Sequence, residues 1–297
     1  MAGSWSDTIR RLTGMGGRAG SGGGPRARVL AVAAQKGGVG KTTTAVNLAV
    51  AFARYEGLRT LLLDLDGQGH VGAALASQFT DGDTTTLSDV LLGHGRDVDE
   101  LVHPTRIAGL WLVPSDKGLA ATEGILAGRI GKEFLLRGAI RRARERFDVV
   151  VIDCPPNLGN LTLNALTASD ACLVPCDMSV LAMGGVADLL GVVETLRDRL
   201  DHDVRIAGIV PTRVDRRNAR VTAAVMEGLD TAWGDLVCRT RIPVSSALAR
   251  AQMDGVNVFD YDATSPGAVA YRELASEVAT RLALRVAPPA AVLHAAG

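Results

Sequence analysis

Apolar runs of strand length alternate with longer amphipathic stretches along most of this chain. Runs that predict strands lie near residues 28–34, 59–64, 110–113, 147–152, 170–175 and 205–210. Stretches with helical spacing lie near 42–55, 86–92, 132–146, 160–167, 184–200, 218–229 and 268–284. Continuous apolar strands that alternate with helices are typical of a parallel sheet with both faces covered. We therefore predict a doubly wound, mostly parallel α/β sheet with helices on both faces, and ligands at the carboxyl ends of its strands.

The two ends of the chain lack this alternation. We assign residues 29–285 to one domain, 1–28 to a flexible Gly/Arg-rich arm and 286–297 to a short tail, because residues 14–25 have the composition of a flexible linker. Trp5, Ile9 and Leu12 have the spacing of a short amphipathic helix. The arm is also rich in arginine. Two interpretations stay open: a disordered solubilising tail, or an arm that binds a partner or a polyanion.

Composition narrows the class of protein. The chain has 297 residues, 47% of them hydrophobic, and 32 basic residues balance 32 acidic ones. A role with nucleic acid would therefore depend on a local patch of charge. We expect a cytoplasmic protein, because we find no run of 18 apolar residues and no secretory signal. The four cysteines lack paired CxxC spacing, so we expect reduced, buried thiols.

The first predicted strand runs into a glycine-rich loop that opens a predicted helix, KGGVGKTT at residues 36–43. Its core fits the phosphate-binding pattern G-x-x-x-x-G-K-[ST] when position 34 or its neighbour is taken as the first loop position. The glycines allow backbone N–H groups to approach phosphate oxygens, and the helix presents its positive end to them. Lys41 supplies a positive charge to the β- and γ-phosphates, and Thr42 offers a hydroxyl to Mg²⁺. The loop therefore predicts a nucleotide site.

A second lysine, Lys36, opens this loop. KGGVGKTT resembles the deviant Walker A motif of the ParA/MinD family of ATPases, and the chain as a whole is most similar to Soj-like ParA partition proteins. The resemblance covers about residues 29–284 and implies a Mg²⁺-dependent ATPase that forms a homodimer on ATP. In this family the signature lysine reaches the phosphates bound by the partner subunit. Lys36, Lys41 and Asp66 are the catalytic residues that the resemblance implies.

Two predicted strands end in acids, Asp64 and Asp66 after one and Asp153 after the other. Buried carboxylates are costly unless paired or near a cation, which suggests a Mg²⁺ or water-mediated site. By resemblance, Asp66 lies in switch I, orients the attacking water and has an indirect role at the metal. Asp153 belongs to a Walker B strand and holds Mg²⁺ through water, whereas Asp64 is structural. Gly67 replaces the usual proline of the family, and Cys154 is a packing residue.

Two later segments resemble the elements that border the adenine in this family. They are TRVD at residues 212–215 and the Ile-Pro pair at 242–243. The resulting set of ATP-binding residues is Lys36, Gly37, Gly38, Val39, Gly40, Lys41, Thr42, Thr43, Thr212, Asp215 and Pro243.

A cluster of arginines follows this segment. A DNA surface without sequence preference needs clustered basic side chains, and the candidates are Arg213, Arg216, Arg217, Arg220 and Arg250. By resemblance to Soj-like proteins, Arg217 contacts DNA. Ala247 stands where the family has a second arginine, and Arg250 or the N-terminal arm would compensate. The alternative is a solvated charge cluster.

The resemblance implies a nucleoid-associated ATPase that positions or segregates a plasmid, a chromosome or a protein cluster. A ParB-like or other cargo adaptor would stimulate hydrolysis. The alternative is a MinD-like regulator that cycles on membranes, which would need a terminal amphipathic basic helix. The prolines near the C-terminus argue against that helix, so no membrane partner is expected. Iron–sulfur reductases of the nitrogenase type share the loop, but the cysteine spacing does not fit them.

Overall fold

One seven-stranded sheet organises the computed structural model, which describes residues 26–76, 78, 86–93 and 97–284. The strand order is β3-β4-β2-β5-β1-β6-β7. Every pairing is parallel except that of β3 with β4. The strands are β1 (Arg28–Val32), β2 (Thr60–Asp64), β3 (His103–Pro104), β4 (Leu110–Val113), β5 (Val149–Asp153), β6 (Ala171–Asp177) and β7 (Arg205–Thr212). This arrangement confirms the predicted α/β class.

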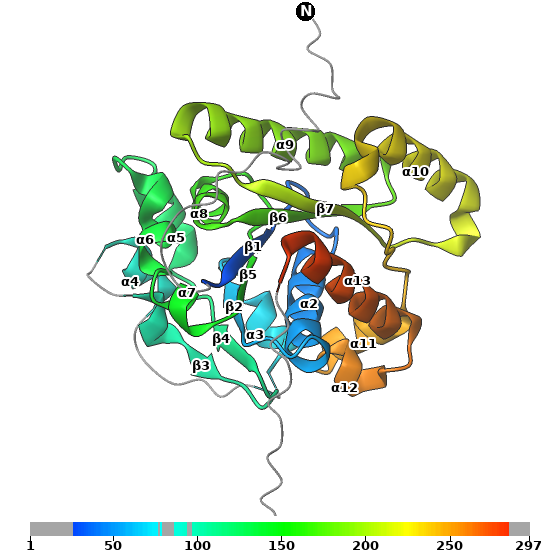
Figure 1. The fold of residues 1–297 in the computed structure, drawn as a ribbon, viewed down its shortest axis with the longest axis horizontal. Helices are drawn as coiled ribbons and strands as arrows, with labels where there is room; N and C mark the ends of the chain where they lie inside the picture. The colour runs from blue at the N-terminus through cyan, green and yellow to red at the C-terminus, as the bar shows by residue number, and fades with distance from the viewer. Residues whose placement is uncertain (1–25, 77, 79–85, 94–96, 285–297) are drawn as a thin grey trace, which may run out of the picture.

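Helices cover both faces of the sheet (Figure 1). One face packs on α2 (Lys41–Tyr55), α3 (His70–Ala74), α11 (Ser246–Met253), α12 (Val258–Asp262) and α13 (Pro266–Leu282). The other packs on α4 (Leu87–Leu91), α5 (Leu119–Leu126), α6 (Leu135–Ala139), α7 (Ala143–Arg146), α8 (Asn160–Ala168), α9 (Val180–Leu200) and α10 (Ala219–Trp233). Short 3₁₀ turns span Val98–Leu101, Lys132–Phe134, Arg216–Asn218 and Gly234–Leu236. The central strands β5 and β1 are buried almost throughout, which explains their continuous apolar runs.

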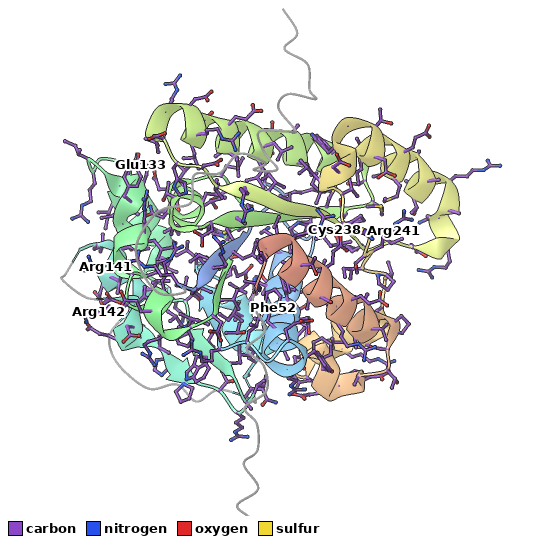
Figure 2. All side chains as sticks on the ribbon, in the orientation of Figure 1. Phe52, Glu133, Arg141, Arg142, Cys238 and Arg241 are labelled. Carbon is purple, nitrogen blue, oxygen red and sulfur yellow. The ribbon has the colours of Figure 1, made fainter. Side chains whose placement is uncertain are left out.

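The side chains form one apolar core on each face of the sheet. Phe52 of α2 is fully buried in the core on the face that α2 and α13 cover (Figure 2). The four cysteines are free and buried. Burial raises the pKa of the Cys172 thiol to about 12. These thiols therefore act as small apolar groups, as the sequence predicts.

The helix predicted over 132–146 is wrong as one continuous element. The segment divides into a 3₁₀ turn, α6 and α7, and the α6 start is tied to α8 because Asn164 Oδ1 accepts from the Leu136 backbone N–H at 3.1 Å. The apolar pattern of the sequence also did not predict α3, α5, α11 and α12. These helices have five to eight residues, too short for a clear apolar period.

Ion pairs hold the amino ends of the strands together. Asp148 accepts hydrogen bonds from the Arg59 backbone N–H at 2.8 Å and from its guanidinium at 2.8 and 3.1 Å. Asp170 accepts from Arg144 Nη2 at 2.6 and 2.7 Å and from the Val29 backbone N–H at 2.8 Å. Charged side chains thus hold the amino ends of the strands, which lie opposite the predicted ligand site.

Candidate nucleotide site

The glycine-rich loop lies between the carboxyl end of β1 and the first turn of α2. Gly38 and Gly40 have φ values of 77° and 90°, in the left-handed region that favours glycine. Gly37 lacks such a φ but lies close to Pro156, whose Cβ would be 3.9 Å from a Cβ added at Gly37. The Thr212 hydroxyl at the end of β7 donates to the Val39 carbonyl at 2.8 Å. Thr42 and Thr43 form the first turn of the helix, so the loop has the form of a phosphate cradle.

The two loop lysines differ in exposure. Lys41 is buried, and its Nζ donates to the Lys36 carbonyl at 3.0 Å. Burial lowers the pKa of Lys41, and the nearby Asp153 acts in the opposite direction. The Lys36 side chain is 41% exposed and lies at the amino end of α9, 3.4 Å from Ser179 Oγ and 3.7 Å from Asp177 Oδ2. Lys41 thus points inward, whereas Lys36 is held at the surface by a weak ion pair.

Three carboxylates converge at the ends of β2 and β5. Asp64 is buried, and it accepts from the backbone N–H of Asp66 at 3.0 Å and of Val71 at 3.2 Å. Its burial raises its pKa to about 7. Asp66 Oδ1 accepts from the Gln68 N–H at 3.1 Å. Asp64 therefore shapes the loop that presents Asp66, which fits the structural role expected for it.

Asp153 is fully buried, and neither of its carboxylate oxygens has a hydrogen-bond partner of ordinary geometry among the described residues. Burial and the nearby Asp64 raise its pKa well above the usual range, whereas the Thr42 hydroxyl and Lys41 lower it. Unpaired buried oxygens beside a threonine hydroxyl suit Mg²⁺, which prefers oxygen ligands and keeps several waters. Within the described ranges no group of three or more acids, histidines or cysteines is arranged to hold a metal. An ion at Asp153 would therefore also need oxygens from the nucleotide and water.

A hollow of about 320 Å³ lies over the loop. Its lining includes the predicted residues Gly37, Gly38, Gly40, Lys41, Thr42, Thr43 and Asp66. It also includes Gln68, His70, Pro156 and Gln252, which the sequence analysis did not assign to the site. Pro156 lies in the loop after β5, three residues beyond Asp153, whereas Gln252 lies on the unpredicted helix α11. We call this hollow the phosphate cavity.

Two of the three residues predicted beside the adenine do not line the phosphate cavity. Asp215 and Pro243 line a separate hollow of about 1050 Å³ between α10 and α13. Asp215 is engaged by Arg217, which donates to it from its backbone and its guanidinium. Thr212 and Arg213 of the same motif do hydrogen-bond the glycine-rich loop, at the carbonyls of Val39 and Gly38.

The candidate DNA-binding arginines lie on two segments. Arg217, Arg220 and Arg250 are exposed, and the Arg217 side chain is 83% exposed while it pairs with Asp215 at 2.9 Å. Arg213 has a φ of 52° and donates to the Gly38 carbonyl at 3.2 Å. The side chain of Arg216 lies outside the described part of the structure. Ala247 is buried in α11, so this position faces the core.

Comparison with known proteins gives the family. A family model described as an AAA domain matches residues 27–206. The chain is 40% identical over 256 residues to the chromosome partitioning protein ParA of Caulobacter vibrioides, covering 86% of this chain and 94% of that protein. It is 36% identical over 252 residues to the sporulation initiation inhibitor protein Soj of Bacillus subtilis, covering 85% and 98%.

Solved structures agree on the fold. A Mycobacterium smegmatis protein described as cobyrinic acid a,c-diamide synthase, with bound ATP analogue and magnesium, matches with a TM-score of 0.72 and 36% identity, over 84% of this chain and 93% of that one. The septum site-determining protein MinD of Pyrococcus horikoshii, complexed with Mg-ADP, has a TM-score of 0.70 at 22% identity, over 85% and 96%, and supports the fold alone. With two lysines in the phosphate loop and these relatives aligned over most of its length, the chain belongs to the ParA/MinD family of P-loop ATPases.

Proposed function

We propose that this ATPase is a spatial organiser that forms a homodimer on ATP and binds nucleoid DNA without sequence preference. A ParB-like or other cargo adaptor stimulates its hydrolysis and releases it, so that a plasmid, chromosome or protein cluster is positioned. The observation that carries the proposal is the match to ParA and Soj along most of both chains, together with the two lysines, Lys36 and Lys41, of the glycine-rich loop. The protein is then cytoplasmic and associated with the nucleoid.

The phosphate cavity supports Mg²⁺-dependent ATP hydrolysis. Lys41 lies in position to neutralise phosphate charge, and the Thr42 hydroxyl and a water held by Asp153 would complete a Mg²⁺ site. A magnesium ion there would neutralise the charge that develops on the phosphates. Asp66 lines the same cavity and is our candidate for orienting the attacking water. Thr212 and the loop backbone set the shape of the cradle.

The position of Lys36 supports a role across a dimer interface. Its ammonium is exposed and is held by one ion pair at 3.7 Å and one hydroxyl at 3.4 Å. An exposed ion pair contributes only about 0–1 kcal/mol. Lys36 therefore leaves this position at little cost, and a second copy of the chain offers phosphates as a stronger partner.

The exposed arginines support the DNA-binding part of the proposal. Arg217 lies in the 3₁₀ turn before α10, Arg220 lies in the first turn of α10, and Arg250 lies on α11. Phosphate contacts give affinity that falls steeply with salt and ignores sequence. Dimer closure would join two such surfaces and add avidity.

The test is retention of random duplex DNA with ATP and Mg²⁺ across a salt series. Arg217→Glu should weaken retention and reduce the salt slope by about one per protomer. Arg199→Glu is the control, an exposed arginine in the last turn of α9. A chain without residues 1–25, which lie outside the described residues, reports on the arm. If neither Arg217→Glu nor the truncation changes retention, the nucleoid proposal is refuted.

Lipid vesicles in a parallel arm of this experiment test the MinD-like alternative. No helix in the described ranges is long and apolar enough to cross a bilayer. The terminal segments in which an amphipathic basic helix would be sought, residues 1–25 and 285–297, lie outside the described residues. ATP-dependent binding to vesicles together with no retention of DNA would favour the membrane-cycling function.

A further inference from the structure

Helix α5 lies behind the phosphate cavity, where it contacts two loops. One loop follows β2 and carries Asp66 and Gln68, and the other follows β5 and carries Pro156, all three of which line the cavity. Figure 1 shows α5 next to α6 and α8 on one side of the sheet. Neither the motifs nor the proposed function uses this helix.

Glu123 joins α5 to the first turn of α8. Its Oε1 accepts from the Asn160 backbone N–H at 2.6 Å, and its Oε2 accepts from the Leu161 N–H at 3.1 Å. Its backbone carbonyl accepts from Asn160 Nδ2 at 3.1 Å. The N-cap residue of α8 is Gly159, which has no side chain to accept a hydrogen bond from the first N–H groups of the helix. Glu123 therefore satisfies N–H groups that the sequence of α8 leaves open, and its negative charge faces the positive end of that helix.

The amino end of α5 packs against the loop of Asp66. A Cβ added at Gly67 would lie 3.4 Å from Leu119 Cβ and 3.5 Å from the Asp116 carbonyl, so this loop passes close to the helix start. Asp116 fixes that start, because its carboxylate accepts from the Gly118 N–H at 2.8 Å and from Ser88 Oγ at 2.6 Å. A short rigid element thus spans the distance between the two loops.

We propose that Glu123 is a positioning residue for ATP hydrolysis, which through α5 keeps the loop after β5 aligned with the loop after β2. Glu123 does not line the cavity itself. Its effect passes through Asn160 and Leu161 to the loop of Pro156 on one side, and through Leu119 to Gly67 on the other. This inference rests on hydrolysis of ATP at the phosphate cavity, as proposed above.

The first test compares steady-state hydrolysis of Mg·ATP by wild type, Glu123→Ala and Glu123→Gln. Misplacement of reacting groups by about 1 Å can cost on the order of 100-fold in rate, so Glu123→Ala should lower kcat by at least about tenfold. KM for ATP should change by less than about threefold, since Lys41 and the glycine loop stay in place. Glu123→Gln keeps one acceptor oxygen and should recover part of kcat. Glu227→Ala, at an exposed position of α10, is the matched control.

The second test uses steric exclusion. A Cβ added at Gly159 would overlap the Glu123 carboxylate, although the φ of −83° at Gly159 suits alanine. Gly159→Ala should therefore displace Glu123 and reproduce the kcat of Glu123→Ala. The double variant should have the same kcat as Glu123→Ala alone, because the short side chain that Glu123→Ala introduces leaves room for the methyl group added at position 159. Additive losses would overturn the assignment.

Amide hydrogen exchange tests the inference without hydrolysis. Glu123→Ala should speed exchange at Asn160 and Leu161 and also in residues 66–70, in the presence of ADP and Mg²⁺. Faster exchange confined to α8, or a kcat equal to wild type, would overturn the inference. A parallel fall in kcat, nucleotide affinity and melting temperature would also overturn it, because Glu123 would then be a structural residue only. A wild type that hydrolyses no ATP refutes the proposed function and leaves the exchange result to decide on Glu123.

Discussion

Replacing Asp153 by asparagine should stabilise the protein when no metal is present and remove its Mg²⁺-dependent activity. The carboxylate is fully buried, and among the described residues it has no hydrogen-bond partner of ordinary geometry. Burial and two further carboxylates, Asp64 and Asp66, raise its pKa, while the Thr42 hydroxyl and Lys41 lower it. Removal of one charge from this group of acids should therefore relieve more repulsion than the lysine loses in attraction.

The size of the effect follows from burial. Asparagine is itself a buried polar group, so the substitution removes only the penalty linked to the charge. An acid whose pKa is raised by folding makes the folded state less stable at any pH above its ordinary pKa, because the unfolded chain ionises more readily, whereas asparagine does not ionise. We expect Asp153→Asn to raise the free energy of unfolding by about 1–3 kcal/mol at neutral pH in the presence of a chelator. For domains of this size each kcal/mol shifts the melting temperature by about 2–4 °C. The matched control is Asp148→Asn at the other end of the same strand, where the loss of an exposed pair with Arg59 should destabilise by about 0–1 kcal/mol.

The assay is thermal unfolding of wild type and both variants, first with chelator and then with Mg²⁺ and ADP. Ligand that binds only the folded state raises the melting temperature, so the wild type should gain more than Asp153→Asn from Mg·ADP. If Asp153→Asn is less stable than wild type with chelator, the buried carboxylate is not a source of instability. If the variant retains Mg²⁺-dependent hydrolysis at the wild-type rate, Asp153 does not serve a metal.

Three further predictions concern the glycine-rich loop and the charged residues around it. Lys41→Ala should abolish nucleotide binding, measured by calorimetry with ATP and Mg²⁺, because it removes the buried phosphate charge; binding at wild-type affinity would contradict its assignment. Lys36→Ala should retain ATP but fail to dimerise in size-exclusion chromatography. Asp177→Asn should favour the dimer slightly, because it releases Lys36 from its ion pair. Loss of an ion pair worth about 0–1 kcal/mol changes the dimerisation constant by about fivefold or less. Asp66→Ala should stay dimeric with ATP and hydrolyse it at least about 100-fold more slowly; a variant that runs as a monomer would show that Asp66 is structural.

Much of the fold can be predicted from the sequence, because buried parallel strands read as unbroken apolar runs. The strand that ends in Asp153 has four consecutive β-branched residues and is buried throughout. The glycine loop can also be recognised from the sequence, since Lys41 and Thr42 follow a glycine at a fixed spacing. Backbone requirements of this kind are local, so a single sequence carries them.

The rest depends on contacts between distant segments. Glu123 lies in an apolar, weakly periodic stretch, and only the fold brings it to α8, 37 residues away at Asn160. The separate hollow that Asp215 lines likewise follows from how α10 lies beside α13. Short helices such as α11 leave too little pattern to place Gln252 at the cavity.

The ion pairs at the amino ends of the strands allow the stability of the protein to be changed separately from its activity. Asp148 with Arg59 and Asp170 with Arg144 lie at the edge of the sheet that faces away from the phosphate cavity. Tighter packing or added charge pairs can be engineered at that edge without a change in any group that faces a ligand. A thermostable variant built there should keep its nucleotide response, whereas stabilising substitutions at the opposite edge would trade activity for stability.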